Sequence, residues 1–266
     1  MKTRSHFQFQ RFVIADDECS MKVGTDAVLL AAWAEVEGAR RILDIGSGSG
    51  VIALVAAQRT NDSCLIDGVE IQTNDCTQAA ANAAASPWSH RVRLTCCAIQ
   101  DHHPEYEYDV ILCNPPYFIK SLLPPKEGRT AARHTVTLDH ESLAGAVDRL
   151  LSKTGAANFI MPPDESDQFR KVMETRGMLT SRVCWFRTRA GKKTERVLMS
   201  FMRALELSER SSLLAGSATY PHEEEIQLYA DGDQWTAKYS ALTADLYLPR
   251  SGSFPKSAAG GSNQGQ

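Results

Sequence analysis

The sequence lacks the features that would place it in a membrane or cross-link it. Its 266 residues contain no run of the roughly 18 apolar residues that a membrane-spanning helix requires, and no apolar stretch follows the charged first residues as in a signal peptide. The seven cysteines are an odd number, with no Cys-x-x-Cys pair and no histidine at zinc-ligand spacing. We therefore expect a cytoplasmic protein with reduced cysteines and no bound metal.

Extremes of composition are also missing. Hydrophobic residues make up 43% of the chain and charged residues 23%, which excludes disordered, collagen-like and coiled-coil classes. The net charge is only −3, but it is unevenly distributed: residues 118–203 hold 16 Lys and Arg against 9 Asp and Glu, a net of +7. A basic block in an acidic chain predicts either a contact with a polyanion or a solvated surface.

Short apolar runs alternate with helical patterns along most of the chain. This alternation predicts an α/β fold, in which a seven-stranded, mostly parallel sheet has helices on both faces. The last two strands, joined by residues 187–195, are expected to form an antiparallel hairpin at one edge. The expected strands are residues 41–45, 64–70, 92–97, 108–113, 156–161, 180–186 and 196–202, and the expected helices are residues 51–57, 74–85, 143–151 and 165–174.

A glycine turn joins the first of these strands to the first of these helices. It reads Asp44-Ile45-Gly46-Ser47-Gly48-Ser49-Gly50, and glycines there let a ligand approach the backbone at a helix N-terminus. Glu70 ends the next strand, where a carboxylate can accept hydrogen bonds from both hydroxyls of a ribose. A dinucleotide site prefers a small residue where this chain has Val51, so a dehydrogenase is disfavoured. The spacing instead resembles the first motif of class I S-adenosylmethionine (AdoMet) methyltransferases.

A second motif, Asn114-Pro115-Pro116-Tyr117, follows the fourth expected strand and so lies at the carboxyl end of the parallel sheet. The prolines fix the backbone and remove N–H donors, which leaves the Asn114 amide oxygen and the Pro115 carbonyl as acceptors for an NH₂ group. Tyr117 offers a face on which a planar base or amide can stack. These groups suit methyl transfer to a planar nitrogen, because they stabilise the positive charge that develops there.

The two motifs together resemble the AdoMet-dependent amino-methyltransferases, a class that includes adenine, guanine and protein-glutamine methylators. Further runs narrow the resemblance to the bacterial tRNA1(Val) adenine-N6 methyltransferase family, from about Phe7 to Leu248. These runs are Phe9–Phe12, Met21–Asp26, Ala32–Ala34, Phe118, Arg133–Thr135, Leu138–His140 and Tyr239–Leu248, the last resembling the family's closing helix. The resemblance implies a Rossmann-like fold and N6-methylation of the adenine immediately 3′ of the anticodon, position 37, in a valine tRNA.

The resemblance also implies roles for residues outside the two motifs. Lys22 would face the AdoMet carboxylate, and Thr25 or Asp26 its ammonium group, although Thr and Asp also begin helices well. Asp44 would orient the glycine turn or bind the ammonium through water, and Glu70 would bind the ribose. Related enzymes place an Asp after the third strand, where it accepts from the amino group of the cofactor's adenine. This chain has Ala98 and Ile99 there, which leaves backbone and apolar contacts to the adenine. Asp101 is a weak substitute for the missing carboxylate.

Basic residues of the positive block are candidates for phosphate contacts with the anticodon loop of the tRNA. Four of them follow the motif Asn114–Tyr117, which we term the acceptor turn: Lys120, Lys126, Arg129 and Arg133. The other four lie around the late hairpin: Arg187, Arg189, Lys192 and Lys193. The nearest alternatives are methylation of glutamine N5 in a protein, methylation of rRNA at guanine N2 or adenine N6, and a non-catalytic RNA-binding protein. No obligatory protein partner is indicated.

The domain organisation follows from these motifs. We expect one methyltransferase domain over residues 1–248, with an N-terminal segment that faces cofactor and substrate (1–40), a catalytic core (41–203) and a C-terminal extension (204–248). Residues 249–266 are rich in Gly, Ser, Ala and Gln, and we expect this tail to be disordered.

Overall fold

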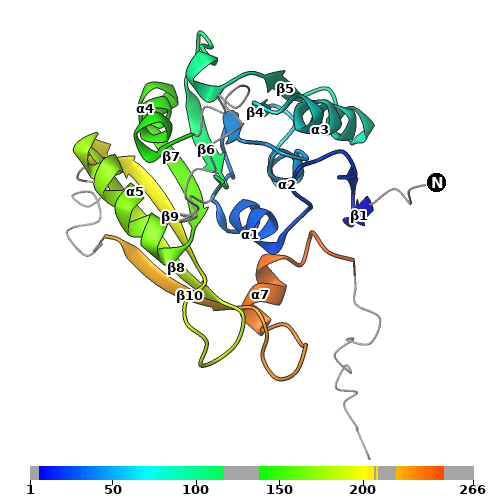
Figure 1. Cartoon of the computed structure of the whole chain (residues 1–266), viewed down its shortest axis with the longest axis vertical. Coiled ribbons are helices and arrows are strands. Elements are labelled where there is room, and N and C mark those ends of the chain that lie inside the picture. The colour runs from blue at the N-terminus through cyan, green and yellow to red at the C-terminus, as the bar shows by residue number, and fades with distance from the viewer. Residues whose placement is uncertain (1–5, 117–137, 207, 209–219, 249–266) are drawn as a thin grey trace, which may run out of the picture.

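The structure is a computed structural model that describes residues 6–116, 138–206, 208 and 220–248 (Figure 1). Its central element is an eight-stranded sheet in the order β10-β8-β9-β7-β6-β3-β4-β5. All neighbouring strands in it are parallel except β9, which is antiparallel to both β7 and β8. The strands are β3 (Arg41–Ile45), β4 (Leu65–Glu70), β5 (Val92–Cys96), β6 (Tyr108–Cys113), β7 (Leu151–Met161), β8 (Met178–Arg187), β9 (Arg196–Arg203) and β10 (His222–Gln227).

Helices cover both faces of this sheet (Figure 1). On one face, α1 (Thr25–Trp33) and α2 (Val51–Gln58) pack together in a core that also receives α7 (Ala237–Leu242). On the other face lie α4 (His140–Leu150) and α5 (Pro163–Thr175). The helix α3 (Thr73–Ala85) packs against the edge strand β5. The expected α/β architecture, with helices on both faces and a late antiparallel hairpin, is therefore confirmed.

Local sequence explains where these helices begin. Asp139 accepts a hydrogen bond from the Ser142 N–H group at 2.7 Å and so caps α4, and Pro163 occupies the first position of α5, where its missing N–H group costs nothing. The helix α2 is apolar on every side, because it is buried between the sheet and α1. Among the described residues, no helix is both long and apolar enough to cross a membrane.

The sheet has one strand more than the sequence predicts. The strand β10 pairs in parallel with β8 and forms the sheet edge, so the β8–β9 hairpin is not at the edge. The sequence does not predict β10, because it contains three successive glutamates and lacks the apolar pattern of a strand. Glu224 is held there by the Arg182 guanidinium at 3.2 Å and by the Trp33 indole N–H group at 2.7 Å. Charge along an edge strand is a common defence against pairing with other chains.

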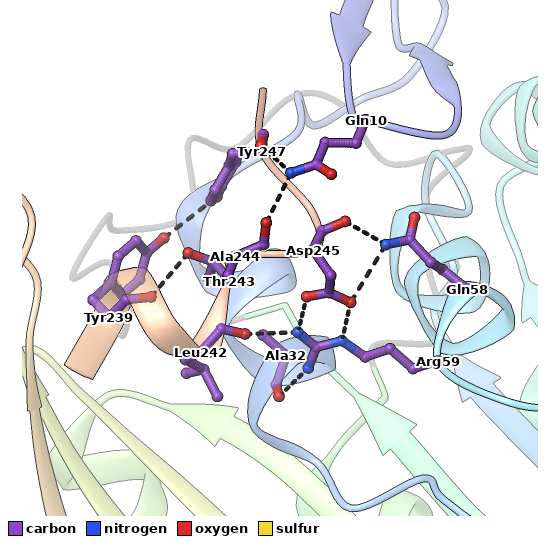
Figure 2. Close-up of polar contacts among 10 residues, drawn as sticks. All are labelled: Gln10, Ala32, Gln58, Arg59, Tyr239, Leu242, Thr243, Ala244, Asp245 and Tyr247. Carbon is purple, nitrogen blue, oxygen red and sulfur yellow. Dashed lines mark hydrogen bonds and ion pairs between the residues drawn. The ribbon is translucent and has the colours of Figure 1, made fainter. Parts of the chain in front are cut away.

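The C-terminal segment fastens onto the N-terminal elements (Figure 2). Arg59, at the end of α2, donates to both Asp245 carboxylate oxygens at 2.6 and 3.1 Å and to the Leu242 carbonyl at 2.6 Å. Gln10 donates to the carbonyls of Ala244 at 2.8 Å and Tyr247 at 2.7 Å. The closing helix α7 ends at Leu242, earlier than the resemblance implies. Beyond it, Tyr247 pairs with Phe9 in an isolated antiparallel β-bridge.

The N-terminal residues form a separate two-stranded sheet of β1 (His6–Gln8) and β2 (Val13–Ala15). Phe9 and Phe12 stack at 4.5 Å between ring centroids and join the core around α1 and α2. All seven cysteines are free thiols, as expected, and five of them are buried. Burial raises the pKa of the Cys19 thiol to about 11, so this cysteine behaves as a small apolar residue.

Candidate active site

The candidate site lies at the carboxyl ends of β3, β4 and β6. From β3 the chain proceeds outward through β4 and β5, whereas β6 and β7 lie on its other side. In open α/β sheets, ligands bind in the crevice where the strand order reverses in this way. Ile45 at the end of β3 is in register with Cys113 at the end of β6. The sheet therefore brings the glycine turn next to Asn114, although Gly50 and Asn114 are 64 positions apart in the sequence.

The glycine turn has the backbone conformation that its sequence predicts. Gly46, Gly48 and Gly50 have φ values of 72°, 53° and 81°, in the left-handed region that favours glycine. The N–H group of Gly46 donates to the Val69 carbonyl at 2.8 Å, which ties the turn to β4. At Gly50, a Cβ atom would also lie 3.3 Å from the Cβ of Ala79, so α3 packs closely on the turn.

Glu70 lies at the end of β4 and is almost fully buried. Its two carboxylate oxygens accept from the backbone N–H groups of Gly48 at 2.9 Å and Gln72 at 2.8 Å. These bonds fix the carboxylate, and each oxygen keeps a second lone pair for a ligand hydroxyl. Gln72 also lines a polar cavity of about 390 Å³, together with Glu18, Cys19, Ser20, Thr73, Asn74 and Asp75.

Asp44 is fully buried beneath the turn. One of its carboxylate oxygens accepts from the Ala53 N–H group at 3.2 Å, and the other has no partner among the described residues. Burial raises the pKa of Asp44 to about 7, against the smaller opposing effect of its hydrogen bonds, and the negative charge of Glu70 adds to the rise. A buried carboxylate with an unused oxygen is suited to hold a cationic ligand group through water.

This raised pKa predicts how stability depends on pH without cofactor. Between about pH 4 and 7 the unfolded chain has released the Asp44 proton and the folded chain has not, so stability falls as pH rises across that window. In Asp44→Asn this loss is absent. The free energy of unfolding of the variant relative to wild type is expected to rise by about 3 kcal/mol from pH 4 to 7, since one pKa unit is worth about 1.4 kcal/mol. Urea titrations at several pH values measure this difference, and a constant difference contradicts it.

The acceptor turn begins directly after β6. Asn114 is half-buried, Pro115 is buried and Pro116 is exposed at the carboxyl edge of the sheet. The prediction that Tyr117 stacks on a substrate falls outside the described residues, as do those for Lys120, Lys126, Arg129 and Arg133 in phosphate contacts. The described part of the turn thus places its acceptors beside the glycine turn.

The predicted methionine-binding residues lie along the same edge. Lys22 donates to the Asp16 carbonyl at 2.5 Å, and Thr25 is the exposed first residue of α1. Asp26 accepts from the Arg196 guanidinium at 2.7 Å, at the start of β9. That ion pair ties α1 to the start of β9 and partly neutralises the Asp26 carboxylate.

At the predicted adenine contact, Ala98 precedes a short 3₁₀ turn (Ile99–Asp101) in which Ile99 is buried and Asp101 is exposed. The Ile99 carbonyl accepts from the Arg149 guanidinium at 3.1 Å. The Ile99 side chain is buried in the core with Leu143 and Val147, so an adenine contact at this position stays a prediction.

The basic hairpin connection, residues 188–195, lies on the same edge of the sheet as Asn114, because β9 begins opposite the end of β7. Arg187 pairs with Glu225 at 2.7 Å, and Arg189 pairs with Asp233 at 2.8 Å. Lys192 and Lys193 are exposed, and their ammonium groups have no ion-pair partner in the part of the chain that the structure describes. These two lysines are the stronger candidates for phosphate contacts.

Taken together, these residues fit a nucleoside cofactor that also bears a cationic group. Each Glu70 oxygen keeps a lone pair for a hydroxyl, Gly46 and Gly48 leave space for close approach, and one Asp44 oxygen has no hydrogen-bond partner within the described ranges. In the described residues there is no group of three or more side chains that could hold a metal ion.

Comparison with known proteins identifies the family. Residues 19–126 match the methyltransferase small domain family. The tRNA1(Val) (adenine(37)-N6)-methyltransferase of Aeromonas hydrophila subsp. hydrophila is 41% identical over 250 residues, which cover 93% of this chain and 99% of the relative. The chain belongs to the tRNA1(Val) (adenine(37)-N6)-methyltransferase family. Another relative of that name, from Dyadobacter fermentans, is 42% identical over 204 residues, which cover 77% of this chain and 85% of the relative.

Solved structures agree with this family at the level of the fold. A structure described as a predicted O-methyltransferase from Agrobacterium tumefaciens superposes with a TM-score of 0.60 and 15% identity, covering 83% of this chain and 96% of that one. This likeness confirms the class I methyltransferase fold that the sequence predicts.

Sequence reasoning missed two buried polar residues on α3, Asp75 and Asn82. Their hydrogen-bond partners are 33, 55 and 67 residues away in the sequence, so no local motif marks them. The available signal was Asn82 itself, the one polar residue in the alanine run from Ala79 to Ala85.

Proposed function

We propose that this protein transfers the methyl group of AdoMet to the exocyclic N6 of adenine 37, immediately 3′ of the anticodon, in tRNA1(Val), and that it does so in the cytoplasm without an obligatory protein partner. The observation that carries the proposal is the full-length similarity to tRNA1(Val) (adenine(37)-N6)-methyltransferases. The position of Asn114 and Pro115 beside the glycine turn supports it, because methyl acceptor and methyl donor must meet at one edge of the sheet.

The acceptor turn makes the N6 amino group of the target adenine more reactive. The N6 lone pair of adenine is delocalised into the ring, and hydrogen bonds from the amino group to Asn114 and the Pro115 carbonyl favour its localisation on nitrogen. Positive charge builds up on N6 as the N–C bond forms, and the same two oxygen dipoles stabilise that charge. The methylated nitrogen is acidic, so it loses its extra proton to solvent and needs no strong base.

The cofactor side is formed by residues of β3 and β4. Bound AdoMet supplies a methyl group on a positively charged sulfur, which is already a good leaving group, so the transfer needs no metal ion. Glu70 orients the ribose, and Asp44 supports the glycine turn and the cationic end of the cofactor. The adenine must leave its stack in the anticodon loop to reach this edge, as enzymes acting on bases require.

A pair of substrates tests the position. A transcript of tRNA1(Val) with adenine 37 is expected to accept one methyl group per molecule from labelled AdoMet, and a transcript with guanine 37 none. Label on both transcripts would contradict recognition of the adenine amino group, and label on the guanine transcript alone would indicate an N2 methyltransferase.

The two free lysines of the hairpin connection give a further prediction. Changing Lys192 and Lys193 together to glutamate is expected to raise KM for tRNA about tenfold and to lower the slope of log KM against log salt by roughly 1 to 2, since each phosphate contact releases counterions. Lys153→Glu is the matched control, because Lys153 is exposed on β7 near the opposite edge. A salt slope equal to that of wild type would mean that the two lysines are ordinary solvated surface residues and do not contact phosphates of the tRNA.

A further inference from the structure

Residues 15–23, which we term the N-terminal strap, run from the end of β2 across the carboxyl edge of the sheet to α1. Glu18, Cys19 and Ser20 of the strap form one wall of the polar cavity that follows β4, and Gln72–Asp75 form the other. The strap therefore faces Gln72, whose N–H group donates to Glu70, across this cavity.

Asn82 fixes the beginning of the strap. Its side chain is buried and makes two hydrogen bonds with Ala15, accepting from the N–H group at 3.0 Å and donating to the carbonyl at 2.8 Å. The second N–H of the same amide donates to the Ser49 carbonyl, at 2.9 Å, inside the glycine turn. One side chain thus sets the distance between the strap and the glycine turn.

Asp75 fixes the middle of the strap. It lies seven residues before Asn82, on the same face of α3, and is also buried. One carboxylate oxygen accepts from the Ser20 N–H group at 3.0 Å and the other from the Ser20 hydroxyl at 2.5 Å. A hydrogen bond also links the two ends of the strap, because the Asp16 side chain accepts from the Val23 N–H group at 3.0 Å.

Packing alone does not require these polar groups. Ala79 and Ala83 already bury the same side of α3, and a buried amide or carboxylate is costly unless all its hydrogen bonds are made. Asn82 makes three such bonds, each to the strap or the glycine turn rather than to its own helix. Such satisfied polar groups fix a single arrangement of the segments that they join.

We propose that Asn82 and Asp75 are positioning residues for AdoMet: from α3 they hold the N-terminal strap and the glycine turn at the separation that the cofactor needs, without touching the reacting atoms. This inference rests on the proposed function only for the identity of the cofactor. It predicts that loss of either link weakens AdoMet binding and loosens the strap, while the chemical step at saturating AdoMet is nearly unchanged.

The main variant is Asn82→Asp, which keeps the shape but turns a carboxylate oxygen toward the carbonyls of Ala15 and Ser49. Its AdoMet Kd, measured by calorimetry without RNA, is expected to rise tenfold or more, as when buried polar groups lose their partners. Hydrogen exchange of the strap amides is expected to accelerate in the absence of cofactor. The matched control is Gln78→Glu, since Gln78 lies on the same helix and has no side-chain hydrogen bond among the described residues. Its Kd and exchange are expected to equal those of wild type.

Two further variants decide the question even if Asn82→Asp does not fold. Ser20→Ala removes only the hydroxyl that bonds to Asp75 and is expected to raise Kd about threefold with kcat at saturating AdoMet unchanged. Asp75→Asn keeps an oxygen for the Ser20 N–H group and is expected to bind AdoMet more tightly than Asp75→Ala. A wild-type Kd and wild-type strap exchange in folded Asn82→Asp, or in Ser20→Ala, would overturn the inference. Failure of wild type itself to bind AdoMet would instead overturn the proposed function.

Discussion

Replacing Asn114 by alanine is expected to lower kcat for tRNA methylation by about 10³-fold, because the amino group loses the acceptor that stabilises its developing charge. The AdoMet Kd is expected to stay within about threefold of wild type, since the substitution removes an interaction made mainly in the transition state. Single-turnover methylation of tRNA with labelled AdoMet measures the first quantity, and calorimetry without RNA measures the second.

Asn114→Asp provides the matched control for that experiment. A carboxylate retains an acceptor oxygen at the same place, so this variant is expected to keep more activity than Asn114→Ala. Near-normal turnover in the alanine variant would mean that the Asn114 oxygen does not act on the nitrogen.

Replacing Glu70 by alanine is the second change with a large expected effect. It removes the acceptor that we propose for two ribose hydroxyls and leaves the N–H groups of Gly48 and Gln72 without their partner. Hydrogen bonds to a charged group are worth about 1.5–3 kcal/mol each, so the AdoMet Kd is expected to rise about 100-fold or more. Calorimetric titration with AdoMet measures this loss.

Glu70→Gln separates charge from shape in the same titration. The amide keeps one acceptor oxygen but turns its NH₂ group toward a backbone N–H donor, so an intermediate Kd is expected. Thermal unfolding of each variant shows whether the glycine turn has lost its structure. An unchanged Kd in a folded alanine variant would remove Glu70 from the cofactor site.

Much of the central site was predictable because local sequence determines it. The glycine turn needs left-handed backbone at Gly46, Gly48 and Gly50, and strand ends of a parallel sheet meet at one edge, which places Glu70 and Asn114 beside it. The family resemblance then specified the nitrogen and the RNA, which the residues alone left open.

Other features depend on partners distant in sequence and were not predictable from local patterns. In the strand β10, Glu224 is paired with Arg182 and Lys238 and accepts from the Trp33 indole, and these contacts form only in the folded chain. Likewise, the ion pair between Asp26 and Arg196 joins residues 170 positions apart, and it partly occupies a side chain that the resemblance assigns to the cofactor.

The central claim is that adenine 37 of a valine tRNA is the methyl acceptor. The most direct test adds the protein and labelled AdoMet to total tRNA from a strain that lacks this enzyme, followed by nucleoside digestion and mass analysis. We expect a new N6-methyladenosine peak confined to valine tRNA. Label on rRNA or on a protein with none on tRNA would contradict the claim and assign the acceptor turn to another planar nitrogen.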